Sequence, residues 1–98
     1  MRCCQRFITD IVLKHSSIYQ DEISNFNSVD LKLSKIFVDK LFKTEGQWIY
    51  TQYYPFGSQT DEFKCYFWYL KYNYITCIFK NDELVSKKIK LQRRYRYD

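Results

Sequence analysis

The stretch of sequence that decides the fold runs from Gly46 to Tyr72 and reads GQWIYTQYYPFGSQTDEFKCYFWYLKY. Aromatic and β-branched residues dominate this stretch, and these residue types favour pleated strands. The segment FGSQTD, residues 56–61, is rich in turn formers and interrupts the aromatic pattern. The sequence therefore predicts two antiparallel strands, residues 47–56 and residues 62–72, joined by a turn.

Two more strands are predicted after this stretch. Residues 74–80 follow a weak turn at Asn73, a residue type that tolerates left-handed backbone geometry. Asn81 and Asp82 then favour a tight hairpin turn. Residues 84–92 alternate in polarity and are predicted to form a fourth strand. The two predicted faces of this strand are Val85, Ile89 and Leu91 on one side, and Leu84, Ser86, Lys88 and Lys90 on the other.

Helical periodicity precedes Gly46. Apolar residues recur at helical spacing within residues 5–15, which predicts a short amphipathic helix. Residues 16–29 are rich in serine, asparagine and acidic residues, so we expect a loop there with one helical turn at most. Asp30 is a candidate N-cap for a second helix that runs to about Thr44. Gly46 lies just past the end of that helix, where glycine commonly terminates helices.

Together these segments predict an α+β fold with two layers. Two N-terminal helices cover one face of an antiparallel meander of three to four strands. The 98 residues of the chain are enough for a single small domain. We expect this domain to span residues 1–92, followed by a basic C-terminal arm over residues 93–98.

The excess positive charge is concentrated at the C-terminal end of the chain. Residues 1–85 contain ten basic and ten acidic residues and are neutral, whereas the whole chain carries a net charge of +5. Such an arm favours binding to a polyanion such as RNA or DNA. The alternative is a solvated terminus that only keeps the protein soluble. The candidate nucleic-acid-binding residues are Lys87, Lys88, Lys90, Arg93, Arg94 and Arg96.

Aromatic residues lie on both faces of the predicted sheet. Alternation along residues 62–72 points Phe63, Cys65, Phe67 and Tyr69 one way, and Tyr66, Trp68, Leu70 and Tyr72 the other. Two helices cover only one face, so the second is expected to pair with another subunit, lie under the N-terminal segment or bind a partner. We therefore predict a homodimer formed through the sheet. The candidate aromatic interaction face comprises Trp48, Tyr50, Tyr66, Trp68 and Tyr72.

No pattern in the sequence indicates catalysis, a cofactor or a metal site, so we predict that the protein is not an enzyme. His15 is the only histidine, and nucleophile-elbow, P-loop and dinucleotide-binding motifs are absent. Cys3 and Cys4 are adjacent and lack metal-ligand spacing. Cys65 and Cys77 are expected to face each other across neighbouring strands as buried thiols. Three acidic pairs fall in predicted loops or turns: Asp21-Glu22, Asp61-Glu62 and Asp82-Glu83.

Cysteine usage and the lack of a secretory signal favour a reducing compartment, either the cytoplasm or the nucleus. No stretch is long and apolar enough to span a bilayer, so no membrane partner is expected. The sequence contains no alanine and is rich in residues with AT-rich codons. This composition is typical of viral and mobile-element proteins.

Charge and aromatic content together predict a small, non-catalytic protein that binds RNA or DNA. The alternative belongs to another functional class: an inhibitor or accessory factor that binds a host or partner protein. Such a factor would use the aromatic sheet face or an open strand edge. Salt-dependent binding to oligonucleotides distinguishes the first function from the second.

Overall fold

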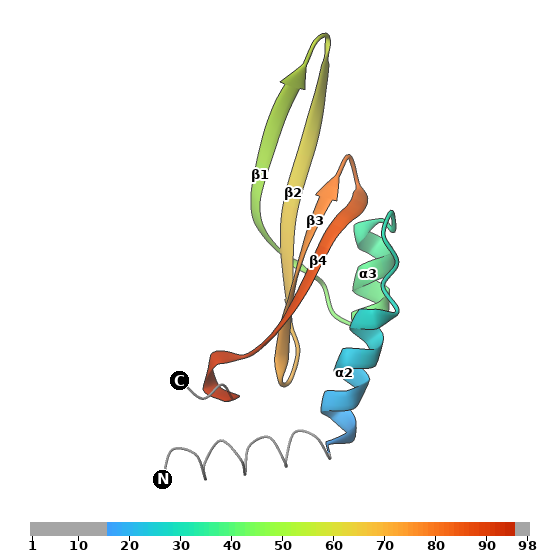
Figure 1. Cartoon of the computed structure of the whole chain (residues 1–98), viewed down its shortest axis with the longest axis vertical. Coiled ribbons are helices and arrows are strands. Elements are labelled where there is room, and N and C mark those ends of the chain that lie inside the picture. Colours follow the sequence, from blue (N-terminus) through green and yellow to red (C-terminus); the bar gives the residue numbers. More distant parts are fainter. Residues whose placement is uncertain (1–15, 96–98) are drawn as a thin grey trace.

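A computed structural model describes residues 16–95 and confirms the predicted α+β fold (Figure 1). Two helices precede one antiparallel sheet with the strand order β1-β2-β3-β4. The helix predicted over residues 5–15 lies outside the described residues. Neither described helix is long and apolar enough to cross a membrane. The elements are α2 (Ser17–Asn27), α3 (Lys35–Phe42), β1 (Gln47–Phe56), β2 (Gln59–Tyr69), β3 (Asn73–Lys80), β4 (Glu83–Leu91) and the 3-10 turn η1 (Arg93–Tyr95).

Two of the three predicted hairpin turns lie where the sequence predicts them, whereas the β2–β3 turn lies at residues 70–72 and Asn73 is the first residue of β3. Gly57 has a φ of 63° in the turn between β1 and β2. Asn81 and Asp82 have φ values of 50° and 67° between β3 and β4. Positive φ at both central residues is the backbone that a two-residue hairpin requires, and it matches the twist of the flanking strands. Local turn chemistry therefore fixes the register of the meander.

The β1–β2 hairpin is longer than the rest of the sheet. The last pair between β2 and β3 joins Phe63 to Lys80, whereas β1 and β2 continue to pair from Tyr53–Glu62 to Phe56–Gln59. Residues 53–62 therefore form a two-stranded overhanging ribbon that projects past the β3–β4 turn (Figure 1). An isolated two-stranded ribbon is only marginally stable in water.

The helix α2 occupies a segment for which the sequence predicts a loop, so that prediction is wrong. The Ser16 side chain caps the helix by accepting a hydrogen bond from the Tyr19 amide at 3.2 Å. Phe26 and, just past the helix, Val29 pack on the hydrophobic core. The polar composition of this segment does not predict a helix, and the tertiary contacts with the core stabilise it.

The helix α3 begins later than predicted. Its N-cap is Ser34 rather than Asp30. The chain before it is held by β4, because the Lys32 amide donates to the Leu84 carbonyl at 2.8 Å and the Leu84 amide donates to the Leu33 carbonyl at 2.9 Å. Backbone that bonds to the start of a strand cannot also form a helical turn, which explains the later start.

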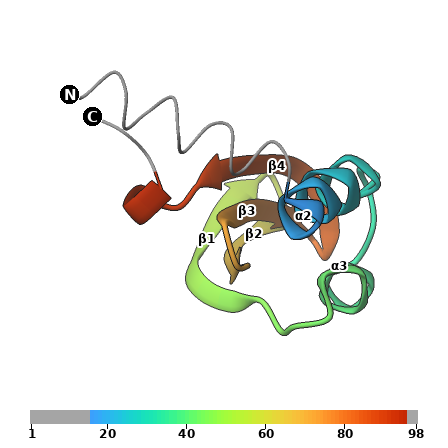
Figure 2. The ribbon, with the colours of Figure 1, turned by 90° about the horizontal axis from the view of Figure 1, so that it is seen from below.

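Both helices lie on one side of the sheet (Figures 1 and 2). The core between them is built around Trp68, whose side chain is completely buried. In contrast, none of the described β1 side chains is buried. We call the sheet face that α2 and α3 cover the helix-covered face, and the opposite one the outer face. The buried core cluster comprises Val29, Val38, Phe42, Trp68, Ile75, Cys77, Phe79 and Leu84.

A β-bulge at Val85 changes which side chains of β4 are buried. The pairing shifts between Ile78 and Phe79, so that Ile78 opposes Ser86 while Phe79 opposes Leu84. Leu84 is therefore buried in the core on the same face as Ile89, and Val85 is exposed. The predicted grouping of Leu84 with Ser86, Lys88 and Lys90 on one face is wrong. An unpaired extra residue of this kind is not visible in a simple alternating pattern.

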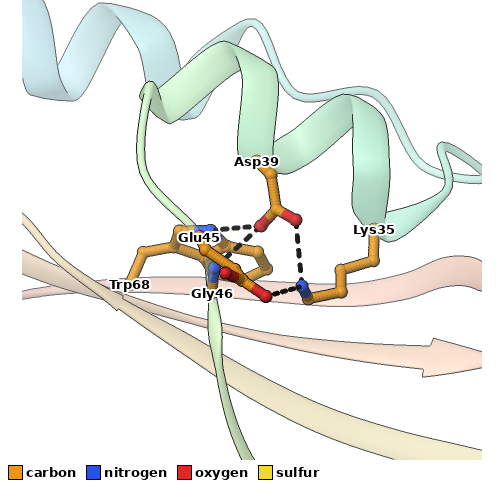
Figure 3. A network of polar contacts seen from close by, with 5 residues as sticks. All are labelled: Lys35, Asp39, Glu45, Gly46 and Trp68. Carbon is orange, nitrogen blue, oxygen red and sulfur yellow. Dashed lines mark hydrogen bonds and ion pairs between the residues drawn. The ribbon is translucent and has the colours of Figure 1, made fainter.

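An aspartate joins α3 to the sheet (Figure 3). Asp39 Oδ1 accepts hydrogen bonds from the Trp68 indole Nε1 at 2.9 Å and from the Gly46 amide at 2.8 Å. Its second oxygen, Oδ2, accepts from Lys35 Nζ at 2.9 Å. One carboxylate thus satisfies the polar atom of the largest core side chain and the amide of Gly46, the last residue before β1.

A second carboxylate joins α2 to the β2–β3 turn. Glu22 is buried and accepts hydrogen bonds from the backbone amides of Tyr72 and Asn73. It also accepts from Asn73 Nδ2 at 2.9 Å. Because buried polar atoms are costly when they are unpaired, this network fixes the position of α2 over the end of the sheet.

We predict that Gly46→Ala strongly destabilises the protein. A Cβ at this position would lie 2.4 Å from Cε2 and Cζ2 of Trp68, and this side chain has no free space to move into. Overpacking of this kind costs about 3 kcal/mol of unfolding free energy, measurable by urea denaturation. Gly57→Ala is the control, because a Cβ there meets nothing within 4 Å. Its left-handed backbone costs only about 1 kcal/mol, so equal losses in the two variants would contradict the prediction.

Candidate nucleic-acid interface

The structure divides the five predicted interaction aromatics between the two faces. Trp68 is buried in the core, so its predicted role on an exposed face is wrong. Tyr66 packs against the same core, and Tyr72 contacts Tyr19 of α2. The five residues do not form one surface.

The two remaining aromatics of that set lie in β1, on opposite faces. Trp48 pairs with Tyr66 and shares the helix-covered face, whereas Tyr50 pairs with Cys65 on the outer face. Alternation alone would place these two on the same face. A register shift between them, at Ile49, reverses their relative orientation.

A different aromatic cluster occupies the outer face. The register pairs Phe67 with Thr76 and Tyr69 with Tyr74 on this face. The ring centroids of Phe67 and Tyr69 are 4.9 Å apart, and those of Tyr69 and Tyr74 are 6.1 Å apart. Tyr69 is 60% exposed. The period of β2 places Phe67 and Tyr69 together, but only the strand pairing shows that Tyr74 completes the cluster.

Two adjoining cavities make this face concave. The larger, of about 550 Å³, is lined by Ile49, Phe67, Tyr69, Tyr74, Thr76, Gln92, Arg93 and Arg94. The smaller, of about 250 Å³, is lined by Tyr74, Thr76, Ile78, Ser86, Lys88 and Lys90. They share Tyr74 and Thr76, and we call the combined hollow the outer trough.

Cations line the outer trough, and none of the described residues that line it is acidic. Its four cationic residues are Lys88, Lys90, Arg93 and Arg94. Within residues 16–95, none of these four forms an ion pair with an acidic side chain. Uncompensated cations around a hollow attract anionic ligands and raise their local concentration.

The start of the predicted basic arm is folded rather than extended. The Tyr95 amide donates to the Gln92 carbonyl at 2.9 Å, and the Tyr95 ring lies 5.1 Å from that of Tyr72. Arg94 donates to the Lys71 carbonyl at 3.3 Å. These contacts hold η1 at the end of the outer trough. Arg96, also predicted to bind nucleic acid, lies outside the described residues.

Lys87 has a structural role that the sequence does not reveal. Its Nζ donates to the Phe26 and Val29 carbonyls at 2.9 and 2.8 Å, and lies 4.6 Å from the Phe26 ring centroid. A cation there stabilises the C-terminal end of α2. Lys87 therefore faces the helices, whereas Lys88 and Lys90, which are also predicted to bind nucleic acid, line the outer trough. Neighbouring residues of a strand point to opposite faces, so Lys87 and Lys88 do not share one basic surface.

The two described cysteines lie on opposite faces of the sheet. Cys65 pairs with Ile78 on the outer face, whereas Cys77 pairs with Tyr66 on the helix-covered face. The sequence predicts that the two cysteines face each other, but the β2–β3 register is offset by one residue from that pairing. Each cysteine is therefore opposite the residue next to the other cysteine. Both thiols are free and buried. Burial raises the pKa of Cys65, and burial raises the pKa of Cys77 to about 12.

The described part of the chain brings together no metal site. Over residues 16–95, no three histidine, cysteine or acidic side chains are placed to hold a metal ion. The candidates Cys3, Cys4 and His15 lie outside this range. Of the three acidic pairs predicted in loops or turns, only Asp82-Glu83 lies at a hairpin turn, with Glu83 beginning β4. Asp61 and Glu62 lie within β2, where they pair with Tyr54 and Tyr53, and Glu22 is the buried anchor of α2.

Comparison of this chain with protein-family models, with curated proteins and with solved structures finds no match. The functional argument therefore depends on the chemistry of the outer trough. Its aromatic cluster and its four cations are the features that a ligand would meet.

We predict that Cys77 makes the stability of the protein sensitive to alkaline pH. The thiol has a pKa of about 12 when folded and 9.0 as its ordinary value. Its contribution is complete below pH 9.0 and is lost as pH rises toward about 12, because only the unfolded thiol ionises in that window. Urea denaturation across this range measures the decline.

Cys77→Ala is the matched control for this decline. The variant is less stable at neutral pH, since it leaves a cavity in the core. Its unfolding free energy should fall less steeply with pH than that of the wild type. Parallel curves would show that other groups cause the decline.

Proposed function

We propose that this protein is a non-catalytic nucleic-acid-binding protein that holds a single strand of RNA or DNA in the outer trough. The observation that carries the proposal is that the exposed Tyr69 and the half-buried Phe67 and Tyr74 share one hollow with four cations, and that no described residue lining it is acidic. Aromatic side chains stack on unpaired bases, and cations neutralise phosphates. A protein that binds single strands needs both.

The position of each group favours a particular arrangement of the ligand. Tyr69 and Tyr74 lie side by side on β2 and β3, where bases can stack on their rings. Lys88 and Lys90 lie on the neighbouring strand β4, opposite Thr76 and Tyr74. Phosphates would follow β4 toward the two arginines at positions 93 and 94, while bases turn inward to the sheet.

A single strand fits this surface better than a duplex. The aromatic rings are on an open sheet, and the bases of a duplex are stacked on one another and closed to such contact. Thr76, Gln92 and Ser86 add polar groups along the trough that can bond to base edges or sugars. The geometry favours no particular base.

We predict that Tyr69→Ala weakens binding to a single-stranded oligonucleotide. The loss of one stacking platform corresponds to about 1–3 kcal/mol. Fluorescence anisotropy with labelled RNA and DNA of mixed sequence measures the affinity, and Tyr69→Trp should retain it. Phe37→Ala is the control, because Phe37 of α3 is 58% exposed and lies on the helix side. Equal effects of the two alanine variants would contradict the proposal.

We also predict that replacing Lys88 and Lys90 by glutamine flattens the dependence of affinity on salt. Each lost phosphate contact lowers the log–log slope by about 0.7 for a single strand. The control replaces two exposed lysines of α3 and its C-cap, Lys40 and Lys43, and removes the same charge from the helix side. Stability should barely change in either variant, since the four side chains are exposed.

The outcome of this titration separates the two functional classes. Weaker binding and a smaller slope in the Lys88/Lys90 variant alone support binding in the outer trough. Equal slopes in both variants would show that the net positive charge of the protein attracts the nucleic acid without a defined binding site. Absence of salt-dependent binding in the wild type would refute the proposal and favour a protein partner instead.

A further inference from the structure

The strand β1 forms an open edge of the sheet, on the side away from the helices (Figures 1 and 2). Its ten residues carry no formal charge. Over residues 16–95, no other segment pairs with its free side. Natural edge strands are commonly protected by lysines, prolines, β-bulges or a covering segment. The other edge, β4, carries three lysines, whereas β1 carries none, and its bulge at Ile49 and its proline at position 55 leave the segment between them open.

The support for β1 differs between its two ends. From Gln47 to Gln52, the partner strand β2 is itself backed by β3 and the helices. From Tyr53 onward, β1 belongs to the overhanging ribbon, which has only two strands. Tyr53 is 62% exposed and lies at the point where this support ends. The ribbon lacks the third strand that would stabilise it.

We propose that two copies of this chain pair through β1 in antiparallel orientation, centred on Gln52. This register places Gln52 opposite Gln52 of the partner subunit, Tyr50 opposite Tyr54, and Thr51 opposite Tyr53. Each opposed pair shares a sheet face, as antiparallel pairing requires. The two four-stranded sheets become one sheet of eight strands.

A second copy fits this edge because one half of β1 is backed by the rest of the sheet and the other half belongs to the two-stranded ribbon. Antiparallel pairing places the overhanging ribbon of each subunit beside the well-supported half of β1 in the other. Each ribbon then gains the neighbouring strands that it lacks. The absence of charge in β1 means that no like charges oppose each other across the twofold axis. Cross-strand tyrosine pairs add favourable contacts on the outer face.

The same pairing places both outer troughs on one face of the dimer. The twofold axis of such a pair is perpendicular to the sheet, so faces are preserved across it. A single strand long enough to reach from one trough to the other would then bind two sites at once. That last consequence rests on the proposed function, whereas the pairing itself does not.

Sedimentation velocity of the full chain without nucleic acid tests the pairing. The wild type is expected to be a dimer at micromolar concentration. Gln52→Lys places two lysines opposite each other at the twofold axis and should raise the dimer dissociation constant by about fivefold, the equivalent of about 1 kcal/mol. Gln52→Glu should act alike. An equimolar mixture of the two variants should restore dimers, since opposite charges then face each other.

Gln59→Lys is the matched control, because Gln59 is an exposed residue of β2 at the ribbon tip. It adds the same charge away from the proposed pairing centre and should leave the dimer unchanged. A wild type that stays monomeric at high micromolar concentration would overturn the proposal. Equal weakening by both lysine variants, or no recovery in the mixture, would also overturn it. Oligonucleotide binding by a monomer would leave the proposed function standing.

Discussion

The fold depends on one carboxylate between α3 and the sheet, that of Asp39. It accepts the indole N–H of Trp68 and the amide of Gly46 through the same oxygen. Trp68 is buried among residues of both layers, so its only polar atom needs a partner inside the protein. Asp39 supplies that partner from α3 and thereby determines how far the helix lies from the sheet. Gly46 permits the arrangement because its missing side chain leaves room for the indole.

This anchoring also explains why the outer face is free. Asp39 and Glu22 bind both helices to the same side of the sheet, one at its middle and one at the β2–β3 turn. Both helices precede the strands in the chain, and the described connections between strands are short turns, so none of them crosses the outer face. Within residues 16–95, no third layer remains to cover Tyr69 and Tyr74. The surface available for a ligand is thus a consequence of where the polar anchors lie.

The sequence predicts the order of elements well because turn chemistry and strand period are local properties. Gly57 and the Asn81-Asp82 pair indicate the hairpins, and the alternation of β2 separates Phe67 and Tyr69 from Trp68 correctly. The errors arise where tertiary contacts determine the secondary structure of a segment or the burial of a side chain. The polar segment that forms α2 is helical because Phe26 and Glu22 find partners in the sheet. The choice of Trp68 and Tyr66 as an exposed face fails because periodicity separates two faces without showing which one the helices cover.

Because of the bulge at Val85, the number of residues in β4 determines which of its side chains face the helices and which face the outer trough. Neighbouring lysines in this strand have different surroundings: Lys87 bonds to carbonyls at the end of α2, while Lys88 lines the outer trough. The assignment depends on the count of residues between the Asn81-Asp82 turn and each lysine. Losing a single residue there would exchange the interior and surface sets, even though composition and net charge would hardly change. In this strand, insertions and deletions are therefore a more severe class of change than substitutions, and spacing carries as much information as residue type.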